Sequence, residues 1–322
     1  MTRYFVVGGA GFIGSHFCDR LMARPDTAAV TVYDNLSSGR EWHIAQHAGD
    51  RRFKIVRADV TQLDTLADAM TGHEVVMHLA SNPDIARAIT EPTIDFEAGT
   101  ALTNNVVEAM RLSGARRILY ASGSGVYGDT GTEVADENYA PMVPISTYGA
   151  SKLAGEALIA SYCFMFGLTG LAFRFGNVVG SRQTHGVGFD FVRRLREDPT
   201  RLRILGDGRQ TKSYIHVDDV VAAVLHAHAT CKDAYNVFNV ATGDTITVTE
   251  IADLACEVLQ LDRARVRYEY SGGDRGWKGD VPVVRLDTTR ITSLGWGCRH
   301  SSREAMRRAL EGLLEESRRG LI

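Results

Sequence analysis

The sequence predicts an α/β fold built on a doubly wound parallel sheet, with a smaller C-terminal α/β lobe. Two observations indicate it. Short apolar runs alternate with helical patterns through the first half of the chain, which is typical of β-α units whose parallel sheet is covered on both faces. A glycine-rich turn follows the first of these runs, as in nucleotide-binding β-α units.

The periodicity gives the order of the elements along the chain. We expect strands at residues 4–7, 30–33, 53–56, 75–79, 117–121 and 168–173. Helices are expected at residues 15–21, 63–70, 101–112 and 148–166. Beyond residue 177 the pattern becomes irregular, with loops expected at 184–188 and 206–209 and a glycine-rich stretch at 271–279. We therefore place the second lobe there.

The first turn has the composition of a pyrophosphate-binding loop. Gly8, Gly11 and Gly14 recur at every third position, and Phe12 and Ile13 lie between the last two. A strand, a glycine turn and a helix N-terminus bring backbone N–H groups and the helix dipole to one point, where an anion binds well. Glycine spacing alone is a weak signal, since such a turn can also serve only to tighten a β-α junction.

An acidic residue strengthens this interpretation. Asp34 ends the second predicted strand, about 20 residues beyond the last glycine, where a carboxylate can bond both hydroxyls of an adenosine ribose. The same carboxylate would repel a 2′-phosphate. The sequence therefore favours NAD over NADP as the cofactor, and Arg40 is the nearby cation that leaves NADP open.

A tyrosine and a lysine four residues apart carry the second chemical signal. Tyr148 and Lys152 open a predicted helix, and four residues are just over one turn, so the two side chains share a face. A cation beside a phenol favours the phenolate and lowers a pKa that is otherwise about 10. Tyr148 is therefore a candidate base for an alcohol, although such a pair taken alone is more often a surface contact.

Candidate ligand-contacting residues lie at the ends of several predicted strands, where the ligands of such sheets bind. They are Asp59, Val60, Leu79, Ala80, Ser81, Ser122, Gly123, Ser124 and Asn177. Taken singly, each is more often a turn residue than a ligand. As a set, they mark the sheet edge at which we expect the site.

Composition bounds the class of protein. The chain has 322 residues, of which 44% are hydrophobic and 23% charged, so it can bury a large core and form two domains. A formal net charge of −3 gives no basic footprint, and clusters such as Arg193-Arg194 and Arg307-Arg308 fit solvated helix faces. We expect no nucleic-acid partner.

The cysteines and the apolar segments bound the compartment. The five cysteines are far apart and include no Cys-x-x-Cys pair, which indicates neither a metal site nor a disulfide framework. The chain contains no apolar run long enough to span a membrane, and its N-terminus enters the first predicted strand directly. We therefore expect a cytoplasmic protein with reduced cysteines and no membrane partner.

Five stretches of the chain resemble one family: Gly8 to Gly14, Asp34-Asn35-Leu36, Tyr148 to Lys152, Arg174 to Asn177 and Ser213 to Asp219. They look like the extended short-chain dehydrogenase/reductases of the NAD-dependent epimerase/dehydratase family, which act on nucleotide sugars. The likeness spans nearly the whole chain. Within the family, the chain is most similar to UDP-glucose (UDP-galactose) 4-epimerases of the archaeal type, which share the stretch from Gly273 to Pro282 and a closing Leu294-Gly295-Trp296.

The resemblance implies a fold and an assembly. It implies a Rossmann domain for a tightly held NAD over residues 1–175, with a returning segment near 214–240. A nucleotide-sugar-binding lobe would cover residues 176–213 and 241–322, with the substrate in a cleft between the two. It also implies a homodimer built through two helices of each subunit.

The resemblance also implies an isomerase chemistry. Tyr148 as phenolate would take the proton of the sugar 4-hydroxyl while NAD takes the C4 hydride, leaving a 4-keto sugar. The keto sugar would then rotate and receive the hydride on its other face. Lys152 would lower the pKa of Tyr148 and bond the nicotinamide ribose.

Further residues gain roles from the same resemblance. Cofactor contacts would come from the glycine turn, Asp34, Asn35 and Ser37, with Asp59 and Val60 at the adenine and Leu79, Ala80 and Ser81 at the nicotinamide. Substrate contacts would come from Ser124, Tyr148, Asn177, Lys212, Arg275 and Asp280.

Two positions depart from the family pattern. The family usually has a Ser or Thr three residues before Val126-Tyr127-Gly128, to hydrogen-bond the sugar 4-oxygen, and this chain has Gly123 there. We favour Ser124 as the replacement, with Ser122 or a water as the alternatives. The second departure is Gly99, where relatives often carry an Asn near the cofactor.

Other reactions stay open. A dehydratase is disfavoured, because dehydratases of this family carry an acid pair where this chain has Ser124 and Gly125. A decarboxylase, a net 4-ketoreductase or an epimerase of another nucleotide sugar is compatible with the motifs. A non-catalytic NAD-binding regulator would account for Gly123 but not for the retention of both Tyr148 and Lys152. The base and the sugar of the nucleotide are not determined by the sequence.

Overall fold

Seven strands form one sheet, in the order β11-β6-β5-β4-β1-β2-β3. In chain order these strands are β1 (Thr2–Val7), β2 (Thr27–Asp34), β3 (Phe53–Arg57), β4 (Val75–His78), β5 (Arg117–Gly123), β6 (Thr169–Phe175) and β11 (Tyr235–Val240). The pairs β1/β2, β1/β4, β2/β3 and β4/β5 are parallel. The strand order reverses beside β1, which is the switch point at which doubly wound sheets bind ligands. The predicted fold class is confirmed.

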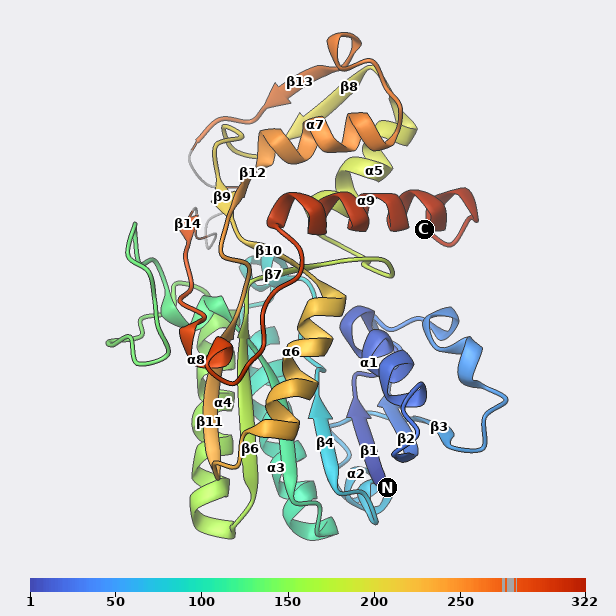
Figure 1. Ribbon diagram of the computed structural model, residues 1–322, viewed down its shortest axis with the longest axis vertical. Coiled ribbons are helices and arrows are strands. Elements are labelled where there is room, and N and C mark those ends of the chain that lie inside the picture. Colours follow the sequence, from blue (N-terminus) through green and yellow to red (C-terminus); the bar gives the residue numbers. More distant parts are fainter. Residues whose placement is uncertain (274–275, 277–280, 282) are drawn as a thin grey trace. The chain divides into compact units, whose positions relative to one another are not determined.

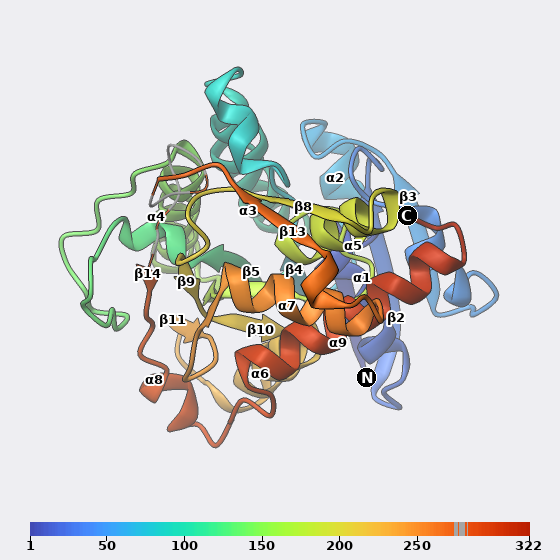
Figure 2. The same ribbon diagram turned by 90° about the horizontal axis from the view of Figure 1, so that it is seen from above.

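Helices cover both faces of this sheet in the computed structural model, which describes residues 1–273, 276, 281 and 283–322. α1 (Phe12–Met22) lies on one face, and α2 (Leu63–Met70), α3 (Leu102–Ser113) and α4 (Thr147–Phe166) lie on the other (Figures 1 and 2). Phe5, Val76 and Ile118 of the strands share a buried cluster with Val106 and Met110 of α3. Burial of these apolar side chains stabilises the layer.

The observed elements follow the predicted ones closely. The helix expected at residues 63–70 forms with those bounds, and the other three differ by at most three residues at either end. A π-helical turn at Phe96–Ala101 precedes α3 and was not predicted. The loop expected at 184–188 is wrong at its end, because α5 already begins at Val187.

The chain divides into two units. The first comprises residues 1–126, 147–174 and 224–238, and the second comprises residues 127–146, 175–223 and 239–322. The predicted first domain, residues 1–175 with a returning segment near 214–240, differs from this division in residues 127–146 and 214–223.

The second unit is more regular than its sequence suggested. Its helices are α5 (Val187–Glu197), α7 (Val248–Val258), α8 (Thr289–Thr292) and α9 (Ser302–Arg318), and α6 (Val217–Thr230) begins in it. Its short strands are β7 (Asn177–Val179), β8 (Arg201–Ile204), β9 (Thr211–Lys212), β10 (Tyr214–His216), β12 (Ile246–Thr247), β13 (Arg267–Tyr270) and β14 (Val283–Val284). Residues of α5, α7, α9 and β8 form its apolar core.

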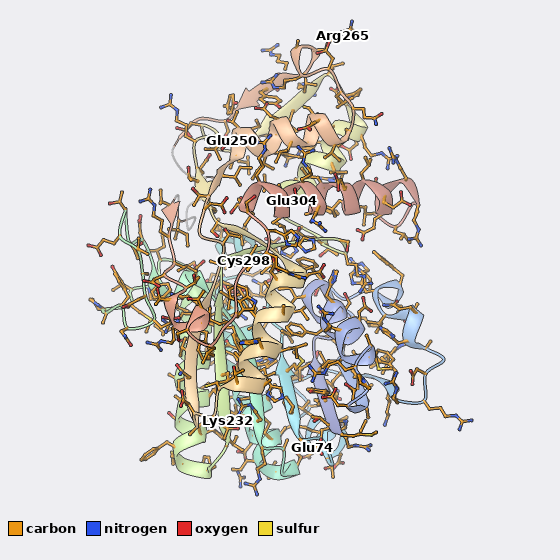
Figure 3. All side chains as sticks on the ribbon, viewed as in Figure 1. Glu74, Lys232, Glu250, Arg265, Cys298 and Glu304 are labelled. Carbon is orange, nitrogen blue, oxygen red and sulfur yellow. The ribbon has the colours of Figure 1, made fainter. Side chains whose placement is uncertain are left out.

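Two helix starts of this unit are capped by a hydroxyl side chain that accepts the backbone N–H of a glutamate three residues later. Figure 3 labels these glutamates, Glu250 and Glu304. Thr247 Oγ1 accepts the Glu250 N–H at 3.1 Å, and the Glu250 carboxylate accepts the Thr247 N–H at 2.8 Å. At α9, Ser301 Oγ accepts the Glu304 N–H at 3.2 Å. Such caps satisfy backbone N–H groups that the helix itself leaves without a partner.

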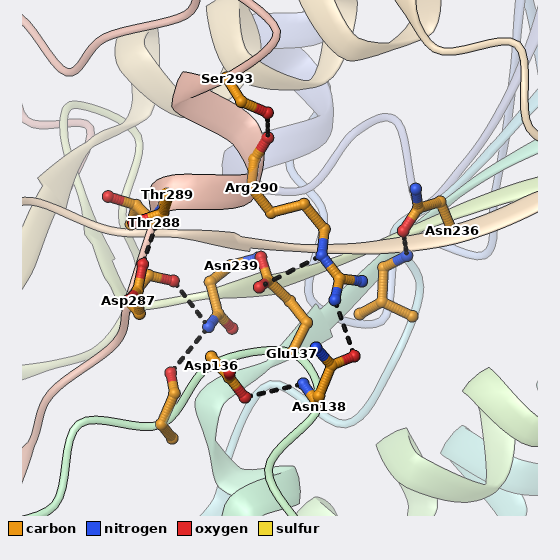
Figure 4. Close-up of polar contacts among 12 residues, drawn as sticks. Asp136, Glu137, Asn138, Asn236, Asn239, Asp287, Thr288, Thr289, Arg290 and Ser293 are labelled. Carbon is orange, nitrogen blue, oxygen red and sulfur yellow. Dashed lines mark hydrogen bonds and ion pairs between the residues drawn. The ribbon is translucent and has the colours of Figure 1, made fainter.

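A polar network in the second unit anchors the segment between η5 (Ser124–Tyr127) and α4 (Figure 4). The Asn239 side-chain amide donates to the backbone oxygens of Ala135 and Asp287, both at 2.9 Å. Glu137 accepts the Asn239 N–H at 2.8 Å and faces the Arg290 guanidinium at 3.5 Å. These contacts explain why residues 127–146 belong to the second unit.

Candidate functional site

The glycine turn has the backbone geometry of an anion cradle. Gly8 has φ +81°, a left-handed conformation that favours glycine. A Cβ on Gly14 would lie 2.3 Å from the Gly8 carbonyl oxygen, so the first turn of α1 can approach β1 this closely only with glycine there. Gly11 precedes α1 and makes no side-chain cap. The first N–H groups of α1, including those of Phe12 and Ile13, have no partner within the helix itself, which suits them to bind an anion.

Asp34 lies buried at the end of β2, beside this turn. Its Oδ2 accepts the Ala10 N–H at 2.9 Å, and its Oδ1 accepts the Leu36 N–H at 2.8 Å. Burial raises the pKa of Asp34, and these two hydrogen bonds oppose that rise. Each carboxylate oxygen keeps a second lone pair, so the ribose-binding role remains open to it.

The ends of β2 and β3 are joined by a side-chain bond. Asn35 Nδ2 donates to Asp59 Oδ2 at 2.8 Å, and the Ser37 N–H donates to Asn35 Oδ1 at 3.0 Å. Hydrogen bonds from Thr61 and from Asn35 lower the pKa of Asp59. Val60 is buried beside it. The predicted adenine contacts Asp59 and Val60 thus lie beside two further predicted cofactor contacts, at the ends of neighbouring strands.

The chain after β4 closes against the glycine turn. The N–H groups of Leu79 and Ala80 both donate to the Val7 carbonyl, at 3.0 and 3.1 Å. A Cβ on Gly8 would meet the Ala80 nitrogen at 2.7 Å. Ser81 follows, and its side chain hydrogen-bonds the Tyr148 phenol. The structure thereby brings the predicted nicotinamide-side residues next to the predicted base.

Tyr148 and Lys152 share one face of α4, as their spacing predicts. The Lys152 Nζ lies 5.4 Å from the centre of the Tyr148 ring and 5.2 Å from that of Tyr120. It donates a hydrogen bond to the Ala121 carbonyl of β5 at 2.8 Å. Lys152 is 3% exposed, so the ammonium is held in place and shielded from water.

The pKa of Tyr148 differs from the expectation. Burial raises it to about 12, a hydrogen bond from Ser81 opposes the rise, and the charge of Asp95 adds to it. Burial also lowers the pKa of Lys152 to about 8, against the charges of Asp95 and Glu156. In the protein alone burial therefore sets the direction of the Tyr148 pKa shift, and a lowering of that pKa by Lys152 stays a prediction.

The buried carboxylate of Asp95 lies near this pair and was not predicted from the sequence. Asp95 is 1% exposed, and it accepts hydrogen bonds from Asn82 Nδ2 at 2.9 Å and from Thr147 Oγ1 at 2.6 Å. Thr147 directly precedes Tyr148, so Asp95 fixes the first turn of α4. No motif marked Asp95, since its partners lie 13 and 52 residues away.

The structure separates the two serines that flank Gly123. Ser122 is buried, and its hydroxyl donates to Glu156 Oε1 at 2.5 Å. Ser124 begins the turn η5 and is half-buried. A Cβ on Gly123 would meet no atom within 4 Å. The usual Ser or Thr would therefore fit at this position, and Ser122 already has another partner.

The second departure from the family pattern has a steric reason. Gly99 lies in the π-helical turn before α3. A Cβ there would be 2.6 Å from Ser151 Oγ and 2.8 Å from Ser151 Cβ. An Asn would therefore require α4 or this turn to shift.

Of the predicted substrate residues, Asn177 and Lys212 lie in the second unit, whereas Ser124 and Tyr148 lie in the first. Asn177 begins β7, and its Nδ2 donates to the Ser213 carbonyl at 3.3 Å. Lys212 is the last residue of β9, is half-buried and directly precedes Ser213. Asn177 and Lys212, both predicted to bind substrate, therefore both lie next to Ser213. Arg275 and Asp280 lie outside the described residues.

Comparison with known proteins identifies the family. Residues 4–241 match the profile of the NAD dependent epimerase/dehydratase family. The chain belongs to this NAD-dependent epimerase/dehydratase family. It is an extended short-chain dehydrogenase/reductase, as its motifs indicated.

Relatives of this family enzyme cover its whole length. The putative UDP-glucose 4-epimerase of Methanocaldococcus jannaschii is 30% identical over 97% of this chain and 99% of its own. The dTDP-glucose 4,6-dehydratase of Streptomyces griseus is 28% identical over 94% of this chain and 95% of its own. A crystal structure of a UDP-galactose 4-epimerase is 36% identical, with a TM-score of 0.87 over 98% of this chain and 99% of that one.

The site of this epimerase/dehydratase family member fits the cofactor of its family, NAD. The uncapped start of α1 offers N–H groups to a pyrophosphate, and the glycine positions leave no Cβ in its way. Asp34 presents a carboxylate at the end of the next strand.

Among the described residues, none of the helices has the length and apolar character to cross a membrane.

Proposed function

We propose that the protein catalyses the NAD-dependent 4-epimerisation of a nucleotide hexose, of the UDP-glucose and UDP-galactose type. The observation that carries this proposal is the tyrosine-lysine pair on α4. Lys152 Nζ lies 5.4 Å from the Tyr148 ring, and the Ser81 hydroxyl reaches the phenol from the end of β4. A base beside the nicotinamide end of the cofactor site suits the oxidation of a sugar alcohol.

The residues of the chain would divide the work as follows. When bound, NAD supplies the acceptor for the C4 hydride and the donor that returns it. Tyr148 would take the proton from the 4-hydroxyl and give it back after the 4-keto sugar has rotated in the site. Lys152 would hold the phenolate and the nicotinamide ribose. Ser124 would hydrogen-bond the 4-oxygen in place of the hydroxyl that Gly123 lacks.

A dehydratase is disfavoured by the same segment. Removal of water after oxidation needs an acid and a base near the sugar C5 and C6, and the two positions after Gly123 carry Ser124 and Gly125. The likeness to the UDP-galactose 4-epimerase structure at 36% identity favours epimerisation over the 28% likeness to a dehydratase.

The second unit is proposed to bind the nucleotide part of the substrate. Asn177 and Lys212 would contact the diphosphate, since amide and ammonium donors suit phosphate oxygens. Arg275 and Asp280 are proposed for the diphosphate and the ribose. In this proposal the first unit holds the cofactor and the second holds the sugar nucleotide.

A homodimer is proposed from the surface of α4. Phe164 and Met165 are 93% and 68% exposed near its C-terminal end, and Leu112 of α3 is 52% exposed. Exposed apolar groups on two neighbouring helices are typical of an interface. Phe164→Asp should convert a dimer into a monomer in sedimentation analysis, and an unchanged dimer would place the interface elsewhere.

The reaction is tested with substrate deuterated at C4. Because the hydride leaves and returns to the same carbon, UDP-galactose formed from C4-deuterated UDP-glucose should keep its deuterium, with no net NADH formed. NMR of the products of several nucleotide sugars identifies the sugar. Deuterium lost to solvent, or a sugar that has lost water, would overturn the proposal.

A further inference from the structure

Two neighbouring residues of β5 are held by two residues of α4 that are one helical turn apart. Lys152 Nζ donates to the Ala121 carbonyl at 2.8 Å, and Glu156 Oε1 accepts the Ser122 hydroxyl at 2.5 Å. The next two residues along the strand are Gly123 and Ser124. Contacts with α4 thus fix the end of β5 directly before Gly123 and Ser124, the segment that would face the sugar 4-oxygen.

An arginine of the adjacent strand completes this arrangement. Arg174 near the end of β6 donates to Glu156 through Nη2 at 2.7 Å and through Nε at 3.0 and 3.2 Å to its two oxygens. The side chains of Arg174 and Glu156 are 3% and 5% exposed. A buried ion pair of this kind needs good geometry to offset its desolvation, so it holds the carboxylate in one orientation.

The same carboxylate contributes to the charge balance around Lys152. The titratable groups that surround this ammonium are Tyr148 and Glu156 on α4, Tyr120 on β5, His78 on β4 and Asp95 before α3. The charges of Asp95 and Glu156 both favour the protonated lysine, against its burial. Glu156 is therefore linked both to the strand end and to the lysine.

We propose that Glu156, held by Arg174, is a positioning residue for the active site: through Ser122 it sets the place of Gly123 and Ser124, and from one helical turn away its negative charge supports the positive charge of Lys152. This rests on the proposed function and assigns a role to Arg174, which the family motif marked without explaining. A displacement of about 1 Å at a reacting centre can cost about 10²-fold in rate.

The test compares Glu156→Gln with Ser122→Ala, which removes one hydroxyl and leaves the ion pair. We expect kcat to fall about tenfold to 10²-fold in Glu156→Gln and less in Ser122→Ala, with KM changed by less than about threefold in both. Glu156→Gln should also move the high-pH loss of kcat to lower pH, because Lys152 loses a supporting charge. Ser122→Ala should leave that pH unchanged.

The matched control is Glu108→Gln. Glu108 also pairs with an arginine, Arg111, and accepts a hydroxyl from α4, that of Tyr162, at 3.1 Å. The Glu108→Gln substitution should leave kcat and the pH profile at wild-type values.

Amide hydrogen exchange supplies a measurement without substrate. Exchange in the peptide that carries residues 121–124 should rise in both site variants and not in the control, while thermal unfolding stays cooperative. This readout tests the positioning even if the reaction proves not to be epimerisation. Unchanged exchange in both variants, or a kcat loss with no shift of the pH profile in Glu156→Gln, would overturn the proposal.

Discussion

The Lys152 ammonium lies 5.4 Å from the centre of the Tyr148 ring, one turn further along α4. In the protein alone, burial raises the pKa of Tyr148 to about 12 and lowers that of Lys152 to about 8, so Tyr148 is not a phenolate base. At neutral pH the phenol is protonated and the lysine is charged. A further positive charge beside the phenol would favour the phenolate.

Tyr148→Phe should lower turnover by about 10² to 10⁴, because it removes the group that exchanges the proton. The amount of NAD bound should stay at the wild-type level. Tyr162→Phe is the control on the same helix, since its hydroxyl bonds Glu108 at 3.1 Å. Steady-state kinetics and extraction of the bound nucleotide measure both effects, and a Tyr148→Phe enzyme with more than about a tenth of wild-type turnover would exclude Tyr148 as the base.

Binding of NAD should release a proton at neutral pH. The oxidised nicotinamide ring is a cation, and a cation next to Tyr148 lowers the phenol pKa from about 12 toward the working pH. Titration calorimetry in buffers of different ionisation enthalpy counts the proton released. Tyr148→Phe should release none, and equal release by both proteins would assign the proton to another group.

Turnover should fall as the pH rises through about 8. The pKa of Lys152 is lowered to about 8, so the ammonium is charged below that pH and is lost above it. The fall should be present in kcat, which reports the enzyme-substrate complex. Lys152→Ala should be inactive at every pH and should also bind NAD more weakly. A kcat that stays constant to pH 10 would show that the charge of Lys152 is not required.

Ser124→Ala should lower turnover by about one to three orders of magnitude, as for a lost transition-state hydrogen bond. Ser122→Ala should do much less, because its hydroxyl is turned to Glu156. Gly123→Ser should restore turnover in the Ser124→Ala background, since a Cβ there meets no atom within 4 Å. If neither Ser124→Ala nor Ser122→Ala lowers turnover, the hydrogen bond to the sugar 4-oxygen would come from a water or from Ser81.

Local spacing determined much of the fold and part of the site. The sheet, its helices, the glycine turn and the Tyr148-Lys152 pair follow from periodicities and short intervals along the chain. Asp34 follows from its distance to the last glycine and from the end of β2. These features depend on residues within one β-α unit or one helix turn, so a single sequence suffices to predict them.

Tertiary contacts decided the rest. Ser122 is unavailable because Glu156, 34 residues away, accepts its hydroxyl, and Glu156 is held in turn by Arg174 from another strand. Gly99 is required because Ser151 approaches it. The pKa of Tyr148 rises because the folded chain removes water from the phenol. Each depends on which distant segments pack together and on how much solvent they exclude, which no local pattern in the sequence encodes.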